Sequence, residues 1–370
     1  MNIAVIGTGY VGLVAACCLS NSGYKVVAVE KDLDKLGRLQ QGMIPIYEEG
    51  LKDLFIEVVR CGRLTFTHDL EEALAHASVV FIAVGTPSRV DGRVDLSQVN
   101  HVSQTIMSLA DRPVTVIMKS TVPPGTGKSI CERFFCKARA PIRYVSNPEF
   151  LREGKAVWDW YHPDRIVIGS DDHEAIEQVI ELYSDIDAPK VRMDITSAEM
   201  VKYVSNAFLA TKISFINEIA NLCERVGADI DSVASTVGMD KRIGSHFLQA
   251  GLGYGGSCFP KDTKGLDYIS AFNGYNFSLL KSVIEVNARQ RVLAVRKLIQ
   301  KLGGLADKRI TVFGLAFKPG TDDIREAPAL DIIEQLISEG AQVTACDPMN
   351  EGRLEKFARY FPVKRTHYQS

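Results

Sequence analysis

The sequence contains no long run of apolar residues, and this argues against an integral membrane protein. A membrane-spanning helix needs about 20 apolar residues in succession, whereas one of the longest apolar runs here, residues 13–19, has seven. The N-terminus also lacks a basic segment followed by an uninterrupted apolar core, so we expect no secretory signal. Without either feature, we expect a cytoplasmic protein with no membrane partner.

An excess of charge of one sign is also missing. Forty-three Lys and Arg residues oppose 45 Asp and Glu residues, which leaves a formal net charge of −2. Proteins that bind nucleic acids usually carry a basic surface, so we expect no nucleic-acid partner. The eight cysteines include no C-x-x-C pair, and we therefore expect neither a disulfide framework nor a metal site.

The elements that are present are typical of an α/β protein. A length of 370 residues suffices for two to three domains. Stretches of helical composition separate a series of short apolar segments. Those segments lie at residues 2–6, 25–29, 79–84, 114–118 and 142–145. The alternation predicts a mostly parallel, doubly wound sheet.

The middle of the chain is predicted to be helical. Residues 196–226 contain neither Gly nor Pro and begin with the capping-box spacing Thr196-x-x-Glu199, which favours one helix of about 45 Å. A second long helix is predicted at residues 279–302. Helices of this length suggest a spine or a dimer interface. Much of the first helix should be packed, because apolar residues recur on it at helical spacing. These are Val201, Val204, Phe208, Ile213, Ile216 and Ala220.

The strand and helix pattern returns after residue 308, with strands predicted at 310–313 and 342–346 and a helix at 327–339. We therefore expect three domains: a sheet domain at residues 1–195, a helical central domain at 196–305 and an α/β domain at 306–370. The last segment has room for about one βαβ unit, so we expect its Rossmann-like sheet to be truncated, with an exposed edge.

The glycines Gly7, Gly9 and Gly12 form a G-x-G-x-x-G turn between the first predicted strand and helix. In such turns the first glycine permits the tight turn, the second lets the backbone approach a pyrophosphate, and the third allows close helix packing. Glu30 ends the second strand, where a carboxylate binds ribose hydroxyls and repels a 2′-phosphate. The pattern predicts an NAD site, and a glycine-rich turn without a ligand is the alternative.

Cys258 lies in a glycine-rich segment, Gly255-Gly256-Ser257-Cys258, which makes its thiol accessible. The nearby Lys261 could favour the thiolate, and Asp262 could act as a base or orient a water molecule. A structural cysteine is the alternative. The other seven cysteines lie in helix-like or strand-like settings, and we expect most of them to be core residues. They are Cys17, Cys18, Cys61, Cys131, Cys136, Cys223 and Cys346.

Two further pairs of polar residues could carry chemistry. Glu149 and Glu153 would share one face if their segment is helical, and either could act as a base or bind sugar hydroxyls; a solvated loop is the alternative. Lys202 and Asn206 are one turn apart on the long predicted helix. Lys202 could extend to solvent or supply positive charge to a developing oxyanion.

Together these groups fit the oxidation of a primary alcohol to an acid through an aldehyde. The thiol would trap the aldehyde as a thiohemiacetal, a second oxidation would give a thioester, and water would release the acid.

The chain resembles the UDP-glucose/GDP-mannose dehydrogenase family over nearly all of residues 1–348. The resemblance runs through MNIAVIGTGYVGL, KSTVPPGT, NPEFLREG, AEMVKYVSNAF, NEIANLCE, RIGSHFLQAGLGYGGSCFPKD and GLAFKPGTDDIREAP. It implies an NAD-binding Rossmann domain, a dimerising middle that carries the cysteine, and a C-terminal UDP-binding domain. Phe259 and TDDIREAP look more like the UDP-glucose branch. That branch implies NAD-dependent four-electron oxidation of UDP-glucose to UDP-glucuronate for polysaccharide biosynthesis, by a homodimer or higher homo-oligomer.

The resemblance also implies roles for individual residues. Cys258 looks like the thioester-forming nucleophile, with Asp262 and Lys202 as partners in water activation and oxyanion stabilisation. Glu149 matches a position associated with thioester hydrolysis. Asn206 and Thr121 match polar groups around the reacting sugar carbon and the active-site water. The implied catalytic residues are Cys258, Lys202, Asp262, Asn206, Glu149 and Thr121.

Two further sets of residues match ligand contacts of the family. The implied cofactor contacts are Gly7, Gly9, Tyr10, Val11, Gly12, Glu30, Lys35, Thr86, Thr121, Glu153, Lys261 and Arg325. The implied substrate contacts are Glu149, Phe150, Leu151, Lys202, Asn206, Arg242, Gln249, Tyr254, Gly255 and Lys318. Arg242 would come from the partner subunit, and no metal is implied.

Other functions remain open. GDP-mannose and UDP-N-acetylmannosamine dehydrogenases share the cysteine loop, while a 3-hydroxyacid-type dehydrogenase shares only the glycine-rich start. A C-terminally truncated, inactive relic that binds NAD or a nucleotide sugar is a further alternative. It arises because residues 361–370 resemble no later motif of the family.

Overall fold

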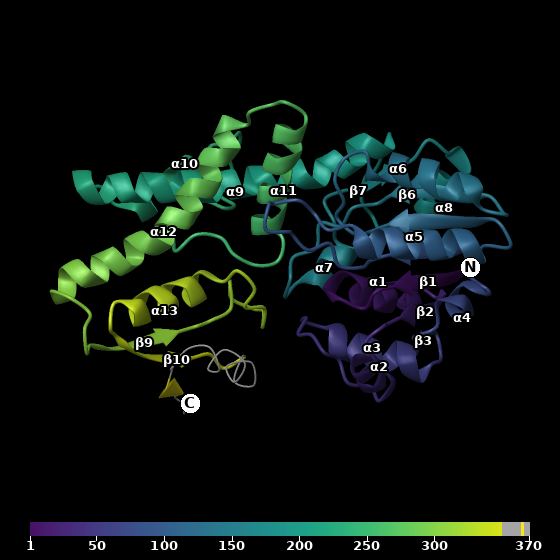
Figure 1. Cartoon of the computed structure of the whole chain (residues 1–370), viewed down its shortest axis with the longest axis horizontal. Coiled ribbons are helices and arrows are strands. Elements are labelled where there is room, and N and C mark those ends of the chain that lie inside the picture. The colour runs from purple at the N-terminus through teal and green to yellow at the C-terminus, as the bar shows by residue number, and fades with distance from the viewer. Residues whose placement is uncertain (350–363, 366–370) are drawn as a thin grey trace. The chain divides into compact units, whose positions relative to one another are not determined.

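The structure is a computed structural model that describes residues 1–349, 364 and 365 (Figure 1). The chain divides into two compact units, Met1–Tyr203 and Val204–Ser370. The boundary falls inside the long helix α9 (Ile195–Val226). Each unit has a sheet of its own.

The first unit is built on an eight-stranded sheet with the order β3-β2-β1-β4-β5-β6-β7-β8. Its strands are β1 (Asn2–Ile6), β2 (Lys25–Val29), β3 (Leu64–Thr67), β4 (Val79–Ile82), β5 (Val114–Met118), β6 (Ile142–Ser146), β7 (Ile166–Gly169) and β8 (Lys190–Met193). All pairs are parallel except β6 with β7. This confirms the predicted doubly wound sheet, and its order reverses between β1 and β4, where such sheets bind ligands at the carboxyl ends of the strands.

Helices cover both faces of this sheet. They are α1 (Tyr10–Asn21), α2 (Leu33–Gln40), α3 (Leu51–Arg60), α4 (Leu70–Leu74), α5 (Ser97–Leu109), α6 (Thr126–Arg133), η1 (Phe135–Lys137), α7 (Ala156–Tyr161) and α8 (His173–Leu182). Alternate side chains of β1 pack into two different hydrophobic cores, because successive strand residues point to opposite faces of the sheet. Ile3 and Val5 pack with α1, α3, α7 and α8, and Ala4 and Ile6 pack with α4, α5 and α6.

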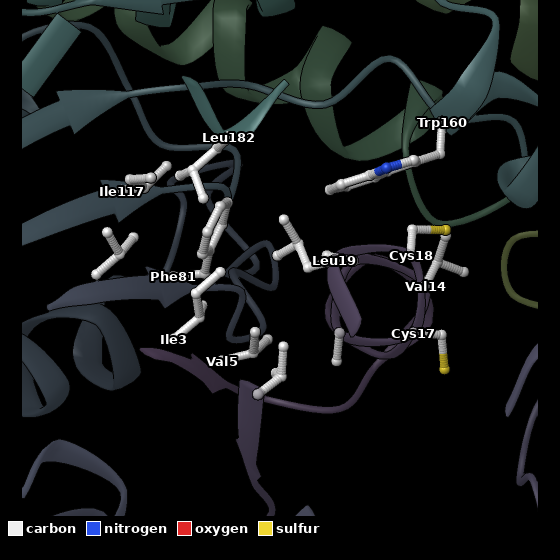
Figure 2. Close-up of a cluster of buried hydrophobic side chains, with 14 of the residues drawn as sticks. Ile3, Val5, Val14, Cys17, Cys18, Leu19, Phe81, Ile117, Trp160 and Leu182 are labelled. Carbon is white, nitrogen blue, oxygen red and sulfur yellow. The ribbon is translucent and has the colours of Figure 1, made fainter. Parts of the chain in front are cut away.

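Figure 2 shows the first of these cores, in which Cys17 and Cys18 of α1 lie among Val14, Leu19 and Trp160. Burial raises the pKa of the Cys17 thiol to about 12, which keeps it protonated and inert.

The expectation that most of these seven cysteines are core residues is confirmed by Cys17, Cys18, Cys223 and Cys346, which are buried, whereas Cys131 is half-buried. Cys61 and Cys136 are exposed, because they lie just beyond α3 and inside the short turn η1 rather than on an inward helix face.

The second unit combines long helices with a small parallel sheet. Its elements after α9 are α10 (Ile230–Gly238), α11 (Phe259–Phe272), α12 (Ser278–Leu302), β9 (Arg309–Phe313), α13 (Pro328–Ser338), β10 (Gln342–Cys346) and β11 (Lys364–Arg365). The sheet has the order β11-β10-β9, and α12 and α13 pack with it in one core. The predicted βαβ unit is confirmed. Strand β11 adds a third strand to this sheet. It lies in the last part of the chain, for which the sequence predicted neither a strand nor a helix.

Helix α9 has the predicted length, at 32 residues, but its surface is less packed than expected. Ile216 is buried, whereas Val204 and Phe208 are 48% and 64% exposed. These two residues belong to a row of exposed apolar side chains on α9, here called the α9 stripe. The α9 stripe consists of Val204, Phe208, Phe215, Leu222 and Val226. Helical periodicity predicts which face of a helix is apolar, but it does not predict whether residues of the same chain bury that face.

Among the described residues, no helix combines the length and the apolar character that a membrane crossing requires.

Candidate active site

The glycine-rich turn after β1 has the backbone geometry that a dinucleotide phosphate needs. Gly7 has φ +98°, and a Cβ there would lie 2.6 Å from the Ala83 carbonyl oxygen. A Cβ on Gly12 would lie 1.9 Å from the carbonyl oxygen of Gly7. Gly9 caps α1 and has no atom within 4 Å of its Cβ position. The turn is therefore tight against the sheet and open at the helix N-terminus, which fits the pyrophosphate of NAD.

Glu30 lies directly after β2 and is buried. Burial alone would raise the pKa of its carboxyl group, but three hydrogen-bond donors outweigh this effect and lower the pKa. The donors are Asp32 N at 3.0 Å, Lys35 Nζ at 2.7 Å and Thr8 Oγ1 at 2.5 Å. Lys35 also donates to the Thr8 carbonyl oxygen. Glu30 is thus an ionised acceptor held beside the glycine-rich turn, as ribose binding requires.

Other predicted cofactor contacts of this unit lie at the edge of the sheet where the parallel strands end. Thr86 and Thr121 lie in the loops after β4 and β5, and the carboxyl ends of parallel strands meet at one edge. Thr86 is buried and Thr121 is half-buried. Tyr10 and Val11 form the first turn of α1 and are half-buried.

Glu149 forms a buried ion pair with Lys202, a contact that sequence spacing could not reveal. Lys202 Nζ lies 2.9 Å from Glu149 Oε1, and the two side chains are only 4% and 5% exposed. Lys202 therefore does not extend to solvent, so that alternative was wrong, and the alternative in which it supplies positive charge to a developing oxyanion remains. The second carboxylate oxygen accepts the N–H of Leu151 at 2.6 Å, and Lys202 Nζ lies 5.5 Å from the centre of the Phe150 ring.

The segment that carries Glu149 and Glu153 is not helical, because no helix or strand covers residues 147–155. The condition for a shared helix face of Glu149 and Glu153 is therefore not met, and the segment is a loop. A proline follows Asn147 and disfavours a helical conformation for that residue, and Glu48 accepts the N–H groups of Gly154 and Ala156. Glu153 is half-buried.

In the second unit, Cys258 is half-buried and caps the N-terminus of α11. The glycines before it press against residues 317–328. A Cβ on Gly255 would lie 2.3 Å from the Glu326 carbonyl oxygen, and a Cβ on Gly256 would lie 2.8 Å from the Phe317 ring. Gly256 N also donates to the Arg325 carbonyl oxygen at 2.9 Å. Close backbone packing thus places a thiol at a helix N-terminus, where the helix dipole stabilises negative charge.

Asp262 is fixed one helical turn after Cys258. Its N–H donates to the Cys258 carbonyl oxygen at 2.8 Å, and its side chain is only 1% exposed. Asn206 Nδ2 donates to Asp262 Oδ2 at 2.6 Å, and Lys261 Nζ lies 2.5 Å from Asp262 Oδ1. The structure therefore brings together Asn206, Lys261 and Asp262, three of the residues selected from the sequence.

The predicted substrate loop is held by polar residues that the sequence reasoning missed. Tyr254 N donates to Asn287 Oδ1 at 2.7 Å, and Asn287 Nδ2 donates back to the Tyr254 carbonyl oxygen at 3.0 Å. Gly251 N donates to Asn217 Oδ1 at 2.8 Å. Tyr254 is buried and Gln249 is exposed. An asparagine inside a long predicted helix is the signal that could have identified these positions.

Three remaining candidates lie nearer to solvent. Arg242 is exposed and pairs with Asp240 at 2.6 Å. Arg325 pairs with the buried Asp323 at 2.6 Å. Lys318 is half-buried.

The expected capping box at the start of α9 is also corrected. Ser197 N bonds to Asp194 Oδ1, so Asp194 caps the helix. Glu199 instead accepts the N–H groups of Gly125 and Gly127 at 2.6 and 2.7 Å, and burial raises its pKa to about 7. The carboxylate thereby connects α9 to the start of α6, in the segment that follows Thr121.

Comparison with known protein families identifies the chain. Residues 1–187 match the NAD binding domain of the UDP-glucose/GDP-mannose dehydrogenase family, residues 196–289 its central domain, and residues 311–366 its UDP binding domain. The chain belongs to this family. The matches confirm the predicted NAD-binding domain, helical middle and C-terminal UDP-binding domain of a UDP-glucose/GDP-mannose dehydrogenase. They also correct one expectation, because residues 361–366 do fall within the family's UDP binding domain.

Individual members of the UDP-glucose/GDP-mannose dehydrogenase family are similar over most of their length. UDP-glucose 6-dehydrogenase YwqF of Bacillus subtilis is 49% identical over 351 residues, which are 94% of this chain and 80% of the relative. The UDP-glucose 6-dehydrogenase of Rhizobium meliloti is 45% identical over 100% of this chain and 86% of its own. The solved structure of a UDP-glucose dehydrogenase from Pyrobaculum islandicum superposes with a TM-score of 0.95 at 41% identity, covering 100% of this chain and 86% of its own.

Proposed function

We propose that this chain oxidises UDP-glucose to UDP-glucuronate with NAD, through a thioester on Cys258. The observation that carries the proposal is the half-buried thiol at the N-terminus of α11, with the Asp262, Asn206 and Lys261 cluster one turn further on. The family assignment and the names of the relatives support UDP-glucose as the substrate.

The overall reaction consumes one primary alcohol, two NAD and one water, and yields one carboxylate, two NADH and three protons. NAD, when bound, supplies the acceptor for the hydride that leaves the sugar carbon in each of the two oxidations. Gly7, Gly9 and Gly12 would hold its pyrophosphate and Glu30 its ribose.

Cys258 acts on the aldehyde formed by the first oxidation. The thiolate donates an electron pair to the carbonyl carbon, a C–S bond forms, and the carbonyl oxygen becomes the oxyanion of a thiohemiacetal. Lys202 and Asn206, one turn apart on one face of α9, stabilise that oxyanion with a positive charge and an amide N–H. Loss of a hydride from the same carbon then leaves the thioester.

Hydrolysis of the thioester needs a proton acceptor. Water attacks the thioester carbon, Glu149 accepts a proton of that water, and the C–S bond breaks to return the thiolate. Asp262, fixed on α11, orients the water or shares the proton. Thr121 supplies a further hydroxyl for this water molecule.

The substrate assignment is tested by comparing NADH formation from UDP-glucose, GDP-mannose and UDP-N-acetylmannosamine in parallel. We expect kcat/KM for UDP-glucose to exceed that for the others by about 100-fold or more, because mispaired polar groups are costly in a sugar-nucleotide site. A higher value for either competitor would overturn the choice of substrate. NAD binding without turnover of any of the three would instead support a binding-only relic.

The α9 stripe is the surface on which the proposed homodimer would form. Its five apolar side chains are spaced so that they follow one side of the helix, and each is between 48% and 68% exposed. A stripe of this kind is covered when a second copy packs its own stripe against it in a two-fold arrangement. Because no disulfide joins the eight cysteines, all of which lie in the described part of the chain, we place the reaction in a reducing compartment, the cytoplasm.

Phe208→Asp is expected to convert the dimer to a monomer, because it would bury a carboxylate twice at a two-fold interface. Light scattering during size-exclusion chromatography measures the mass. Leu33→Asp is the matched control, since Leu33 is 65% exposed on α2, outside the stripe. A monomeric unmodified chain, or a Phe208→Asp variant that stays dimeric, would contradict the assignment of this interface.

A further inference from the structure

Lys119 is a buried lysine to which the proposed mechanism assigns no role. It directly follows β5 and is 6% exposed. Its Nζ donates to Asn147 Oδ1 at 2.8 Å and to the Tyr183 hydroxyl at 3.2 Å. The same atom lies 5.6 Å from the ring centres of Trp160 and Tyr183. A buried ammonium group is costly unless such partners compensate it, so this arrangement calls for an explanation.

The main partner of this lysine is the residue that begins the Glu149 segment. Asn147 directly follows β6, and its N–H donates to the Met118 carbonyl oxygen at 3.0 Å. Its Nδ2 donates to the Val167 carbonyl oxygen at 2.7 Å, and its Oδ1 also accepts the Tyr183 hydroxyl at 2.8 Å. Asn147 thus connects β5, β6 and β7 two residues before Glu149. Its Oδ1 is the acceptor through which the lysine reaches that segment.

The lysine is also within electrostatic range of the buried ion pair. Burial lowers the pKa of Lys119 to about 7, Glu149 acts in the opposite direction, and Lys202 lowers the pKa further. Tyr183 is a further titratable group in contact with it, and burial raises the pKa of that phenol, which keeps it neutral. A change at Lys119 therefore alters the field at both members of the pair.

We propose that Lys119 is a positioning residue for Glu149, which it holds in place for thioester hydrolysis through Asn147. The inference rests on the proposed function, because the hydrolysis step is what gives Glu149 a chemical role. It predicts a selective effect: the loss of Lys119 should slow the release of the acid and leave the first oxidation nearly unchanged.

Lys119→Met tests this selectivity, because methionine has a similar length but neither charge nor N–H donors. We expect acid release to slow by about 10- to 100-fold, the scale of a misplaced catalytic group, while the first NADH forms within about 2-fold of the unmodified rate. Rapid quenching followed by intact-protein mass measurement should show the thioester adduct on Cys258 accumulating during turnover. A variant that slows both steps equally, or neither, would overturn the inference.

Tyr183→Phe is the milder second variant, and it keeps the test decisive if Lys119→Met does not fold. It removes one donor to Asn147 Oδ1 and leaves the lysine in place. We expect the same selective slowing of acid release at a smaller size, about 3-fold, on the scale of one neutral hydrogen bond. Unchanged acid release in a folded Tyr183→Phe protein would count against the inference.

A double-mutant cycle separates action through Glu149 from a general structural role. In a Glu149→Gln background, Lys119→Met or Tyr183→Phe should slow acid release no further, because the group that they position is already lost. Additive slowing would contradict the inference. If the unmodified chain forms no acid from any sugar nucleotide, the proposed function fails and this inference with it. A fully active chain with additive variants would overturn the inference alone.

Discussion

Cys258→Ala is expected to lower the formation of UDP-glucuronate by about 10³-fold or more, the scale of removing a catalytic nucleophile. Without the thiol no C–S bond forms, so the aldehyde is not held as a thiohemiacetal and no thioester is available for hydrolysis. Chromatographic measurement of the acid, together with NADH absorbance, reports this loss directly.

Cys136→Ala provides the matched control for this variant. Cys136 is an exposed free thiol in the short turn η1 of the first unit, so its removal should leave the rate within about 2-fold, as for surface substitutions in general. If Cys258→Ala kept the full yield of acid, the thioester mechanism would be wrong. If both variants lost activity, the effect would belong to thiols in general and not to Cys258.

Lys202→Met is expected to reduce both stability and activity, because it leaves the Glu149 carboxylate buried without its charged partner. Breaking a buried ion pair from one side costs about 3–5 kcal/mol, and the loss of a group that stabilises an oxyanion costs about 10²- to 10³-fold in kcat. Urea unfolding and steady-state kinetics measure the two effects on the same protein.

Two companion variants show which part of the effect belongs to chemistry. Combining Lys202→Met with Glu149→Leu removes both charges and should recover most of the stability but none of the activity. Lys297→Met removes one member of the exposed Lys297–Glu224 pair and should cost less than about 1 kcal/mol. Recovered activity in the double variant would show that the pair is structural only.

The sequence was most informative where a pattern repeats locally. The strands β1, β2, β4, β5 and β6 are short apolar segments, and the parallel sheet follows from their alternation with helices. The strands β3, β7 and β8 were missed because none of them contains more than three successive apolar residues; their sequences are LTFT, IVIG and KVRM. Strand β4 is equally short, but its apolar run continues through residues 83 and 84.

Local sequence patterns could not predict the contacts that build the site. Lys202 and Glu149 are far apart in the sequence and meet only in the tertiary fold, where Lys202 of α9 pairs with a residue of the loop that follows β6. Glu199 has the spacing of a capping residue, yet it binds the start of α6 instead. The side chain of a charged residue can reach several partners, and the tertiary fold decides which one it pairs with.

The stoichiometry of NADH in a reaction with limiting UDP-glucose and excess NAD tests the central claim most directly. The four-electron mechanism predicts two NADH for each UDP-glucose consumed, UDP-glucuronate as the product, and a transient adduct on Cys258 in the intact-protein mass. One NADH per UDP-glucose with an aldehyde product, or two NADH from a Cys258→Ala protein, would contradict it.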